Sequence, residues 1–196
     1  MGKTVEFMYD FVSVPSFIAW KALPPMLEAV GAQLVLTPVL VGGIFKATGN
    51  AGPLAIPAKT EWYRADLALW ARKRGVVFNP SPFLPFRSLG VMRGAYLAAE
   101  RNETGLYVGS VFDAVFVHGR NMGDMQVVAD ALAAAGLDAK AYVQGVERAD
   151  IKQRLLDATQ RAVDRRVFGV PTFFVDGELF FGQDRIEFVL EALQRD

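Results

Sequence analysis

Two kinds of hydrophobic pattern open the chain. Residues 5–11 and residues 33–39 are short apolar runs rich in β-branched and aromatic side chains, which predicts two strands. Between them, apolar residues recur at helical spacing from Phe17 to Val30. Pro24-Pro25 is expected to kink or break this helix, and Gly31 is placed to cap it. A strand, a helix and a strand in this order favour a right-handed parallel crossover.

The middle of the chain has mostly helical spacing. Residues 42–53 are rich in glycine and are predicted to be a loop, and residues 78–85 hold three prolines and no regular element. Helices are predicted at residues 60–74, 89–102, 104–118 and 125–135. Residues 147–167 predict a further helix, with charges at the i, i+3 and i+4 spacings of a solvated face.

The end of the chain returns to strand patterns. Residues 172–175 and 178–181 flank Asp176-Gly177, which predicts a hairpin with a two-residue turn, and residues 185–193 predict a closing helix. Neither end has enough strands for a stable sheet alone, so one sheet built from both ends is expected. The predicted fold is α/β, with residues 1–43 and 146–196 forming a discontinuous sheet domain and residues 44–145 an inserted helical domain.

Composition excludes several classes of function. The 21 basic and 21 acidic residues cancel, and no strongly basic face is apparent, which argues against nucleic-acid binding. The chain has no cysteine, so it cannot perform dithiol redox chemistry itself, and one histidine, His118, argues against a histidine metal site. No apolar run reaches the ~20 residues that span a bilayer. The N-terminus passes directly into strand-like sequence, so we expect a cytoplasmic protein.

The junction of the first strand and helix carries the first candidate chemistry. Ser13 and Ser16 lie where the strand passes into the helix, and a helix N-terminus attracts anions. A hydroxyl there can stabilise a thiolate or a carboxylate, and without cysteine any thiolate must come from a ligand. The structural alternative is that the serines only cap the helix, since serine favours the N-cap and proline the first turn.

Two segments near the C-terminus carry further candidates. Pro171 suits the first position of a strand, and a cis Val170–Pro171 bond would leave the Val170 backbone free to pair with an extended ligand. A trans proline at a strand edge is the alternative. Asp184 opens the last helix, where it either caps the helix or, with the nearby amides, binds an amino-acid zwitterion.

Together these three segments resemble 2-hydroxychromene-2-carboxylate isomerases and kappa-class glutathione transferases. Both families belong to the DsbA-like group, and the resemblance extends to Lys46-Ala-Thr-Gly-Asn50 and the helix at residues 62–70. It implies a thioredoxin-like fold with a large helical insertion. It also implies glutathione as the cofactor, a small aromatic carboxylate as the substrate, and a homodimer. The composition already argues against a metal, a membrane or a nucleic-acid partner.

The resemblance assigns roles by position. Ser13 is implied to be the catalytic residue that faces the glutathione sulfur. The Val170 backbone is implied to pair with the cysteinyl part, and Asn50 to contact the tripeptide. The γ-glutamyl end is implied to be held by Phe181, Gly182, Gln183 and Asp184. Lys46 and Phe83 are implied to contact the substrate, as a basic group and an aromatic wall.

Two departures from the family pattern bear on the chemistry. The usual turn is Ser-Pro-aromatic-Ser, whereas Ser13-Val14-Pro15-Ser16 has its proline one position later. Residues 53–59 lack the Asn-Arg pair that the resemblance associates with substrate carboxylate binding in naphthalene-pathway isomerases. The natural substrate is therefore left open.

The activity implied is a glutathione-dependent isomerisation of 2-hydroxychromene-2-carboxylate or a related aromatic-degradation intermediate. It would proceed by reversible thiolate addition, bond rotation and elimination. Two alternatives stay open at this point. One is a kappa-type transferase that forms stable glutathione adducts. The other is a redox-inactive thioredoxin-fold binding module, in which Ser13 caps a helix and no reaction occurs.

Overall fold

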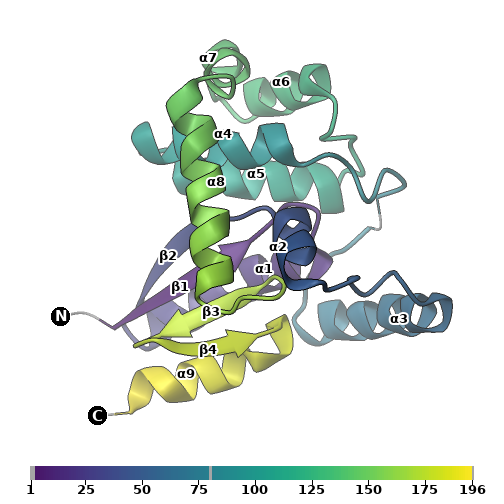
Figure 1. The fold of residues 1–196 in the computed structure, drawn as a ribbon, viewed down its shortest axis with the longest axis vertical. Coiled ribbons are helices and arrows are strands. Elements are labelled where there is room, and N and C mark those ends of the chain that lie inside the picture. The colour runs from purple at the N-terminus through teal and green to yellow at the C-terminus, as the bar shows by residue number, and fades with distance from the viewer. Residues whose placement is uncertain (1–2, 80, 196) are drawn as a thin grey trace.

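A computed structural model describes residues 3–79 and 81–195. Within them, strands from both ends of the chain form one mixed sheet in the order β2-β1-β3-β4 (Figure 1). β1 (Thr4–Tyr9) pairs in parallel with β2 (Gln33–Pro38) and antiparallel with β3 (Thr172–Val175). β4 (Glu178–Phe181) completes the hairpin with β3. The parallel crossover, the hairpin and the single sheet built from both ends are confirmed.

The helices lie around this sheet. Their bounds are α1 (Val14–Ala29), α2 (Val41–Thr48), α3 (Pro57–Lys73), α4 (Leu89–Glu100), α5 (Thr104–Phe116), α6 (Met125–Ala134), α7 (Ala139–Gly145), α8 (Ala149–Asp164) and α9 (Ile186–Gln194), with a 3₁₀ turn η1 (Gln183–Arg185) before α9. Helices α3–α8 form the insertion, which confirms the predicted fold class. The exact domain limits at residues 44 and 145 stay a prediction.

Alternation along β1 divides the core between the two faces of the sheet. Phe7 and Tyr9 face α1, α5 and α9, and the Phe7 ring lies 5.1 Å from that of Phe173 between ring centroids. Met8 faces the opposite side, where it packs with Ile44 of α2 and with α8. Side chains that alternate along a strand point to opposite faces, so one short strand supplies both layers.

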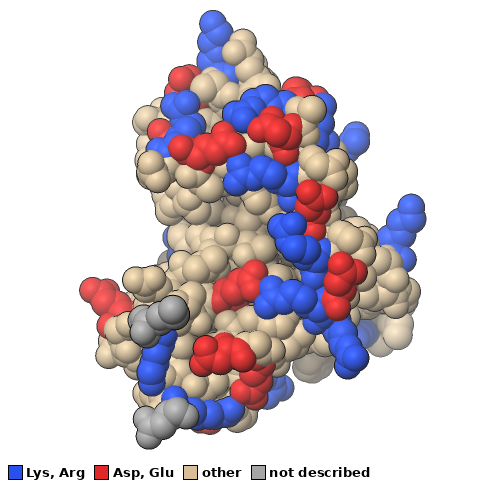
Figure 2. Space-filling view, turned by 60° about the vertical axis from the view of Figure 1, so that its left-hand side comes forward, with Lys and Arg blue, Asp and Glu red and all other residues tan. Residues whose placement is uncertain are grey.

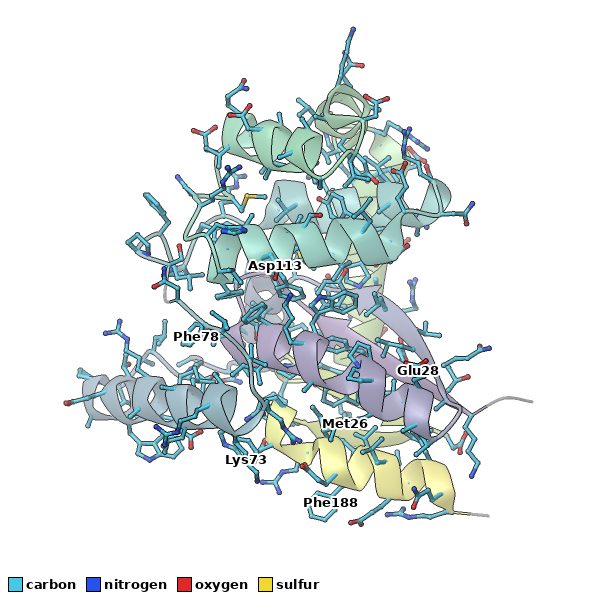
Figure 3. All side chains as sticks on the ribbon, turned by 180° about the vertical axis from the view of Figure 1, so that it is seen from behind. Met26, Glu28, Lys73, Phe78, Asp113 and Phe188 are labelled. Carbon is cyan, nitrogen blue, oxygen red and sulfur yellow. The ribbon has the colours of Figure 1, made fainter. Side chains whose placement is uncertain are left out.

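Helix α1 connects the sheet to the insertion. Seen from behind, α1 runs between α5 and α9, and Asp113 of α5 lies over it (Figure 3). Lys21 of α1 forms an ion pair with Asp113 at 2.6 Å. Phe17 stacks on Phe116 of α5 with ring centroids 5.0 Å apart. Helix α1 is therefore held against the insertion as well as against the sheet domain.

One sequence-based expectation about the helices is wrong, and one short helix was not predicted. Residues 42–53 are not wholly a loop, because α2 occupies Val41–Thr48. Gly43 allows α2 to approach α8 closely, since a Cβ there would lie 3.1 Å from Thr159 Cγ2. Gly43 of α2 thus serves helix packing. The helix predicted at residues 147–167 is confirmed as the shorter α8, and the short α7 before it was not predicted.

Pro24 and Pro25 do not break α1, which runs without interruption from Val14 to Ala29. Each proline removes one backbone donor. The helix nevertheless buries Leu23 and Leu27 on either side of the pair, at 0% and 2% exposure. This packing offsets the missing hydrogen bonds. Gly31 has φ +64° directly after the C-cap, as expected of a helix terminator.

Candidate active site

Ser13 is the N-cap of α1, and its hydroxyl is the centre of a small hydrogen-bond network. The Ser16 N–H donates to Ser13 Oγ at 3.2 Å, and the Ser16 hydroxyl donates to the same oxygen at 2.9 Å. Ser16 is fully buried, whereas Ser13 is partly exposed. The capping interpretation of Ser13 is therefore correct in geometry, and the oxygen also lies at the positive end of the helix.

The Ser13 hydroxyl faces the loop that precedes β3. It donates to the Val170 carbonyl at 3.3 Å, which joins two segments 157 positions apart in the chain. The Val170–Pro171 bond is cis, and the Val170 side chain is 7% exposed. The structure thus brings together two of the residues that the sequence singled out, one hydroxyl donor and one backbone acceptor.

Asn50 lies next to this loop. Its Nδ2 donates to the Phe168 carbonyl at 2.8 Å, and its Oδ1 accepts from the Gly52 N–H at 2.9 Å. Asn50 thereby fixes the segment between α2 and α3 against the loop that leads to Val170. Its amide group has local partners, so Asn50 shapes the edge of the site through the backbone of its neighbours.

The segment after β4 forms the far end of the site. Gly182 has φ +107° and donates its N–H to the Pro171 carbonyl at 3.0 Å, and the Phe181 ring packs on Phe168 with centroids 4.5 Å apart. Asp184 lies within η1, where no side-chain cap bond forms, and pairs with Arg185 at 3.0 Å. The cap interpretation of Asp184 is wrong, because the turn tightens into a 3₁₀ helix before α9.

Gln183 is the most deeply buried polar side chain of this segment. It is 4% exposed, and its Oε1 has no hydrogen-bond partner among the atoms of residues 3–79 and 81–195. Buried acceptors are rarely left unpaired. Gln183 and Asp184 therefore present acceptor oxygens at the same end of the site.

Asp10 is a functional candidate that the sequence interpretation missed. This carboxylate is 1% exposed, and its oxygens accept the Val12 N–H at 3.2 Å and the Val41 N–H at 3.0 Å. Its carbonyl accepts the Ser13 N–H at 3.0 Å. Burial raises its pKa, while these backbone hydrogen bonds and one from Ser88 oppose the rise. An acidic residue that ends an apolar strand was the available signal.

Tyr63 on α3 closes another side of the site. It packs in the cluster that includes Val14, the residue after Ser13. Burial raises the pKa of Tyr63 to about 12, and the carboxylates of Asp66 and Asp184 add to the rise. Tyr63 therefore lies close enough to Asp184 to feel its charge. This approach could not be predicted from local patterns, because it depends on how α3 docks on α1.

The two predicted substrate residues lie farther out. Lys46 is exposed in the last turn of α2, and Phe83 is 47% exposed in the segment between α3 and α4. The structure shows no hydrogen bond or ion pair of either side chain with Ser13. Their substrate roles stay a prediction.

Two negative findings apply to the part of the chain that the structure describes. No group of three or more histidine, aspartate or glutamate side chains gathers in a way that could hold a metal ion. No helix there is long and apolar enough to cross a membrane.

The fold and the site define a thioredoxin-fold protein with a serine, Ser13, at the N-cap of α1. The chain belongs to the DSBA-like thioredoxin domain family, whose model matches residues 4–194. A 2-hydroxychromene-2-carboxylate isomerase of Pseudomonas putida is 28% identical over 192 residues, which cover 96% of this chain and 92% of the relative. Human glutathione S-transferase kappa 1 is 26% identical over 207 residues, which cover 98% and 92%.

Comparison with solved structures supports the same family. A 2-hydroxychromene-2-carboxylate isomerase structure superposes with a TM-score of 0.87 at 26% identity, covering 97% of this chain and 94% of that chain. A probable DsbA oxidoreductase from Streptomyces coelicolor, at 17% identity and a TM-score of 0.78, shares the fold. The chain is therefore similar over nearly all of its length to 2-hydroxychromene-2-carboxylate isomerases and to kappa-class glutathione transferases.

Proposed function

We propose that this protein is a glutathione-dependent isomerase of 2-hydroxychromene-2-carboxylate or a related aromatic-degradation intermediate. The observation that carries the proposal is the Ser13 hydroxyl, which lies at a helix N-terminus and accepts two hydrogen bonds from Ser16 in a chain without cysteine. Such a site favours a bound anion but supplies no sulfur of its own. The thiol must then belong to a ligand.

The polar groups of the site fit glutathione. The Ser13–Val170 hydrogen bond is long at 3.3 Å, and a cysteinyl N–H can replace it as the donor to the Val170 carbonyl. That exchange frees the Ser13 hydroxyl to donate to sulfur. At the other end, the unpaired Oε1 of Gln183 and the carboxylate of Asp184 can accept the γ-glutamyl ammonium.

Bound glutathione supplies a thiolate that adds reversibly to an electrophilic ring carbon, and the ring then opens at its C–O bond. The former double bond is now single and can rotate before the thiol leaves and the double bond forms again. Ser13 and the N-terminus of α1 favour the charged sulfur and lower the thiol pKa. In this proposal Lys46 binds the substrate carboxylate and Phe83 forms an aromatic wall of the substrate pocket. Asn50 contacts the tripeptide, and Phe181 and Gly182 contribute to the γ-glutamyl end. We place the enzyme in the cytoplasm as a homodimer.

Calorimetric titration with glutathione tests the proposal. We expect saturable binding to the wild-type chain at millimolar concentration or below, and a higher pKa of the bound thiol in Ser13→Ala. Absence of saturable binding would leave the redox-inactive binding module as the better account. Binding followed by consumption of glutathione in proportion to product would instead support a kappa-type transferase.

A further inference from the structure

A second concave surface lies where the edge strand β2 meets the helical insertion. It has a volume of about 560 Å³, and none of its lining residues belongs to the site around Ser13. Side chains from β1, α1, β2, α4, α5 and α8 line it. Figure 2 shows the molecule narrowing between the insertion and the sheet, where most of the visible residues are uncharged. This groove has the size of a small-molecule site.

The walls of the groove are apolar and aromatic. Trp20 of α1 and Leu34 and Leu36 of β2 contribute partly buried side chains. Tyr96 of α4 adds a ring that carries the Arg154 guanidinium at 5.0 Å from its centroid. The Tyr96 hydroxyl is already used, because it donates to the Pro38 carbonyl at 2.8 Å. These walls suit a flat apolar ring.

Tyr9 contributes an unpaired donor to the same groove. Its side chain is 0% exposed, and its hydroxyl has no hydrogen-bond partner among the atoms that the structure describes. Burial raises the pKa of Tyr9 well above its usual value, and the nearby hydroxyls of Tyr107 and Tyr96 add to the rise. Tyr9 and Tyr96 are both among the residues that line the groove, so the unpaired hydroxyl belongs to a side chain in its wall. A buried unpaired hydroxyl costs folding free energy unless a ligand satisfies it.

One end of the groove lies at the N-terminus of α5. Thr104 and Gly105, the first residues of the 13-residue helix α5, line it, and the N-cap Glu103 forms no side-chain cap bond. The Glu103 carboxylate instead accepts from Arg101 and Tyr142. The first N–H groups of α5 thus remain available to an anion.

Arg154 lies at the same end. One of its guanidinium nitrogens pairs with Glu100 at 2.7 Å, and Glu100 also pairs with Arg148. A guanidinium has five N–H donors, so the remaining ones can reach a ligand carboxylate.

We propose that this groove is a binding site for a small aromatic carboxylate, separate from the site at Ser13. The ring packs against Trp20, Leu34 and Leu36. The carboxylate binds between the N-terminus of α5 and Arg154. An oxygen substituent on the ring accepts the hydrogen of the Tyr9 hydroxyl. The proposal does not depend on the isomerase reaction, because its groups lie outside that site.

Fluorescence titration with 6-hydroxy-2-naphthoate tests the proposal, in the presence of excess S-hexylglutathione to fill the Ser13 site. We expect saturable binding to the wild-type chain and an affinity about tenfold lower in Arg154→Gln, which loses a charge-assisted contact. Arg148→Gln is the matched control, since it removes the other arginine on Glu100 but does not line the groove. It should bind like the wild type.

Two further variants separate binding from folding. Tyr9→Phe should weaken binding while leaving the melting temperature of the free chain unchanged or higher, because it removes an unpaired hydroxyl. Ala99→Trp should fill the groove from its exposed rim and abolish binding.

Three outcomes would overturn the proposal. The first is no saturable binding when S-hexylglutathione is present. The second is wild-type affinity in both Arg154→Gln and Ala99→Trp. The third is a loss of dimers in Ala99→Trp without probe binding to the wild type, which would assign the groove to a contact between two copies of the chain.

Discussion

The buried hydroxyl of Ser16 donates a hydrogen bond to the hydroxyl of Ser13 at 2.9 Å. The Ser16 N–H donates to the same oxygen at 3.2 Å. Two donors on one oxygen polarise the Ser13 O–H bond and strengthen it as a donor toward any partner. Ser16 is therefore a positioning residue for Ser13 as well as part of the helix start.

Ser16→Ala should weaken this arrangement without breaking α1. The variant loses one buried hydrogen bond, so we expect the free energy of unfolding to fall by about 0.5–1.5 kcal/mol. The thiol pKa of bound glutathione should rise, because Ser13 stabilises the thiolate less. Urea unfolding and the pH dependence of thiolate absorbance measure the two effects. Ser110→Ala, whose hydroxyl only bonds Leu106 within α5, is the control. An unchanged thiol pKa in Ser16→Ala would refute the positioning role.

Asp10→Ala should affect both stability and binding. The Val12 and Val41 N–H groups would lose their acceptor, and each unpaired buried donor costs about 1–3 kcal/mol. Because Asp10 joins the turn before Ser13 to the start of α2, glutathione affinity should fall as well. Calorimetry well below the melting temperature separates the effects. Asp113→Ala, which removes only a half-exposed ion pair, should change stability by less than about 1 kcal/mol. Lower stability with unchanged affinity would show that Asp10 serves the fold alone.

Asp184→Ala should weaken glutathione binding with little change in stability. Asp184 makes no cap bond, and its ion pair with Arg185 is partly exposed, so its loss costs at most about 1 kcal/mol. Removal of a carboxylate from a buried ammonium contact should lower affinity about tenfold or more. Parallel thermal melts and calorimetry check this. Equal losses of melting temperature and affinity would support a structural role.

Gly182→Ala offers a complementary test at the same place. The residue has φ +107°, and an added Cβ would lie 2.4 Å from Asp184 Oδ1. The substitution should displace the carboxylate and add about 1–3 kcal/mol of backbone strain. Both stability and glutathione affinity should therefore fall. Retention of wild-type affinity would mean that the Asp184 carboxylate does not contact the ligand.

We expect the chain to unfold at alkaline pH when its tyrosines lose their protons, at a pH above the usual tyrosine pKa. Burial raises the pKa of all five tyrosines, in the case of Tyr63 and Tyr96 to about 12. The folded pKa values exceed the unfolded value near ~10, so the stabilisation is complete below about pH 10 and is lost as pH rises through the folded values. Tyrosinate absorbance should appear together with the loss of helical circular dichroism. A titration near pH ~10 with intact helices would contradict this.

Local patterns were sufficient to predict much of the fold. The Asp176-Gly177 turn is present with both residues at positive φ, and the strand runs at the two ends of the chain form one sheet. The patterns failed at α2, where two glycines indicated a loop but Gly43 allows close packing against Thr159 of α8. Tertiary contacts of this kind leave no mark in a local window of sequence.

The candidate site could likewise be predicted only as far as local patterns allow. Ser13 and Val170 were each singled out from their own segments, but their hydrogen bond spans 157 positions and appears only in the folded chain. Asp10 was missed because its role depends on Val41, which lies 31 positions away. Local sequence shows that Asp10 is unusual, because it is an acidic residue at the end of an apolar strand. It does not show that Asp10 belongs to a site, because its partners are distant backbone groups.

In the proposed reaction, the sulfur of glutathione adds to the substrate beside Ser13 and is released unchanged. The direct measurement is the conversion of 2-hydroxychromene-2-carboxylate, followed by its ultraviolet spectrum, with glutathione present in much smaller amount than the substrate. We predict that product exceeds the added glutathione many times over, that free thiol is the same before and after, and that Ser13→Ala slows the reaction strongly while still folding. Conversion that stops when glutathione is exhausted, or that proceeds equally fast in Ser13→Ala, would contradict the account.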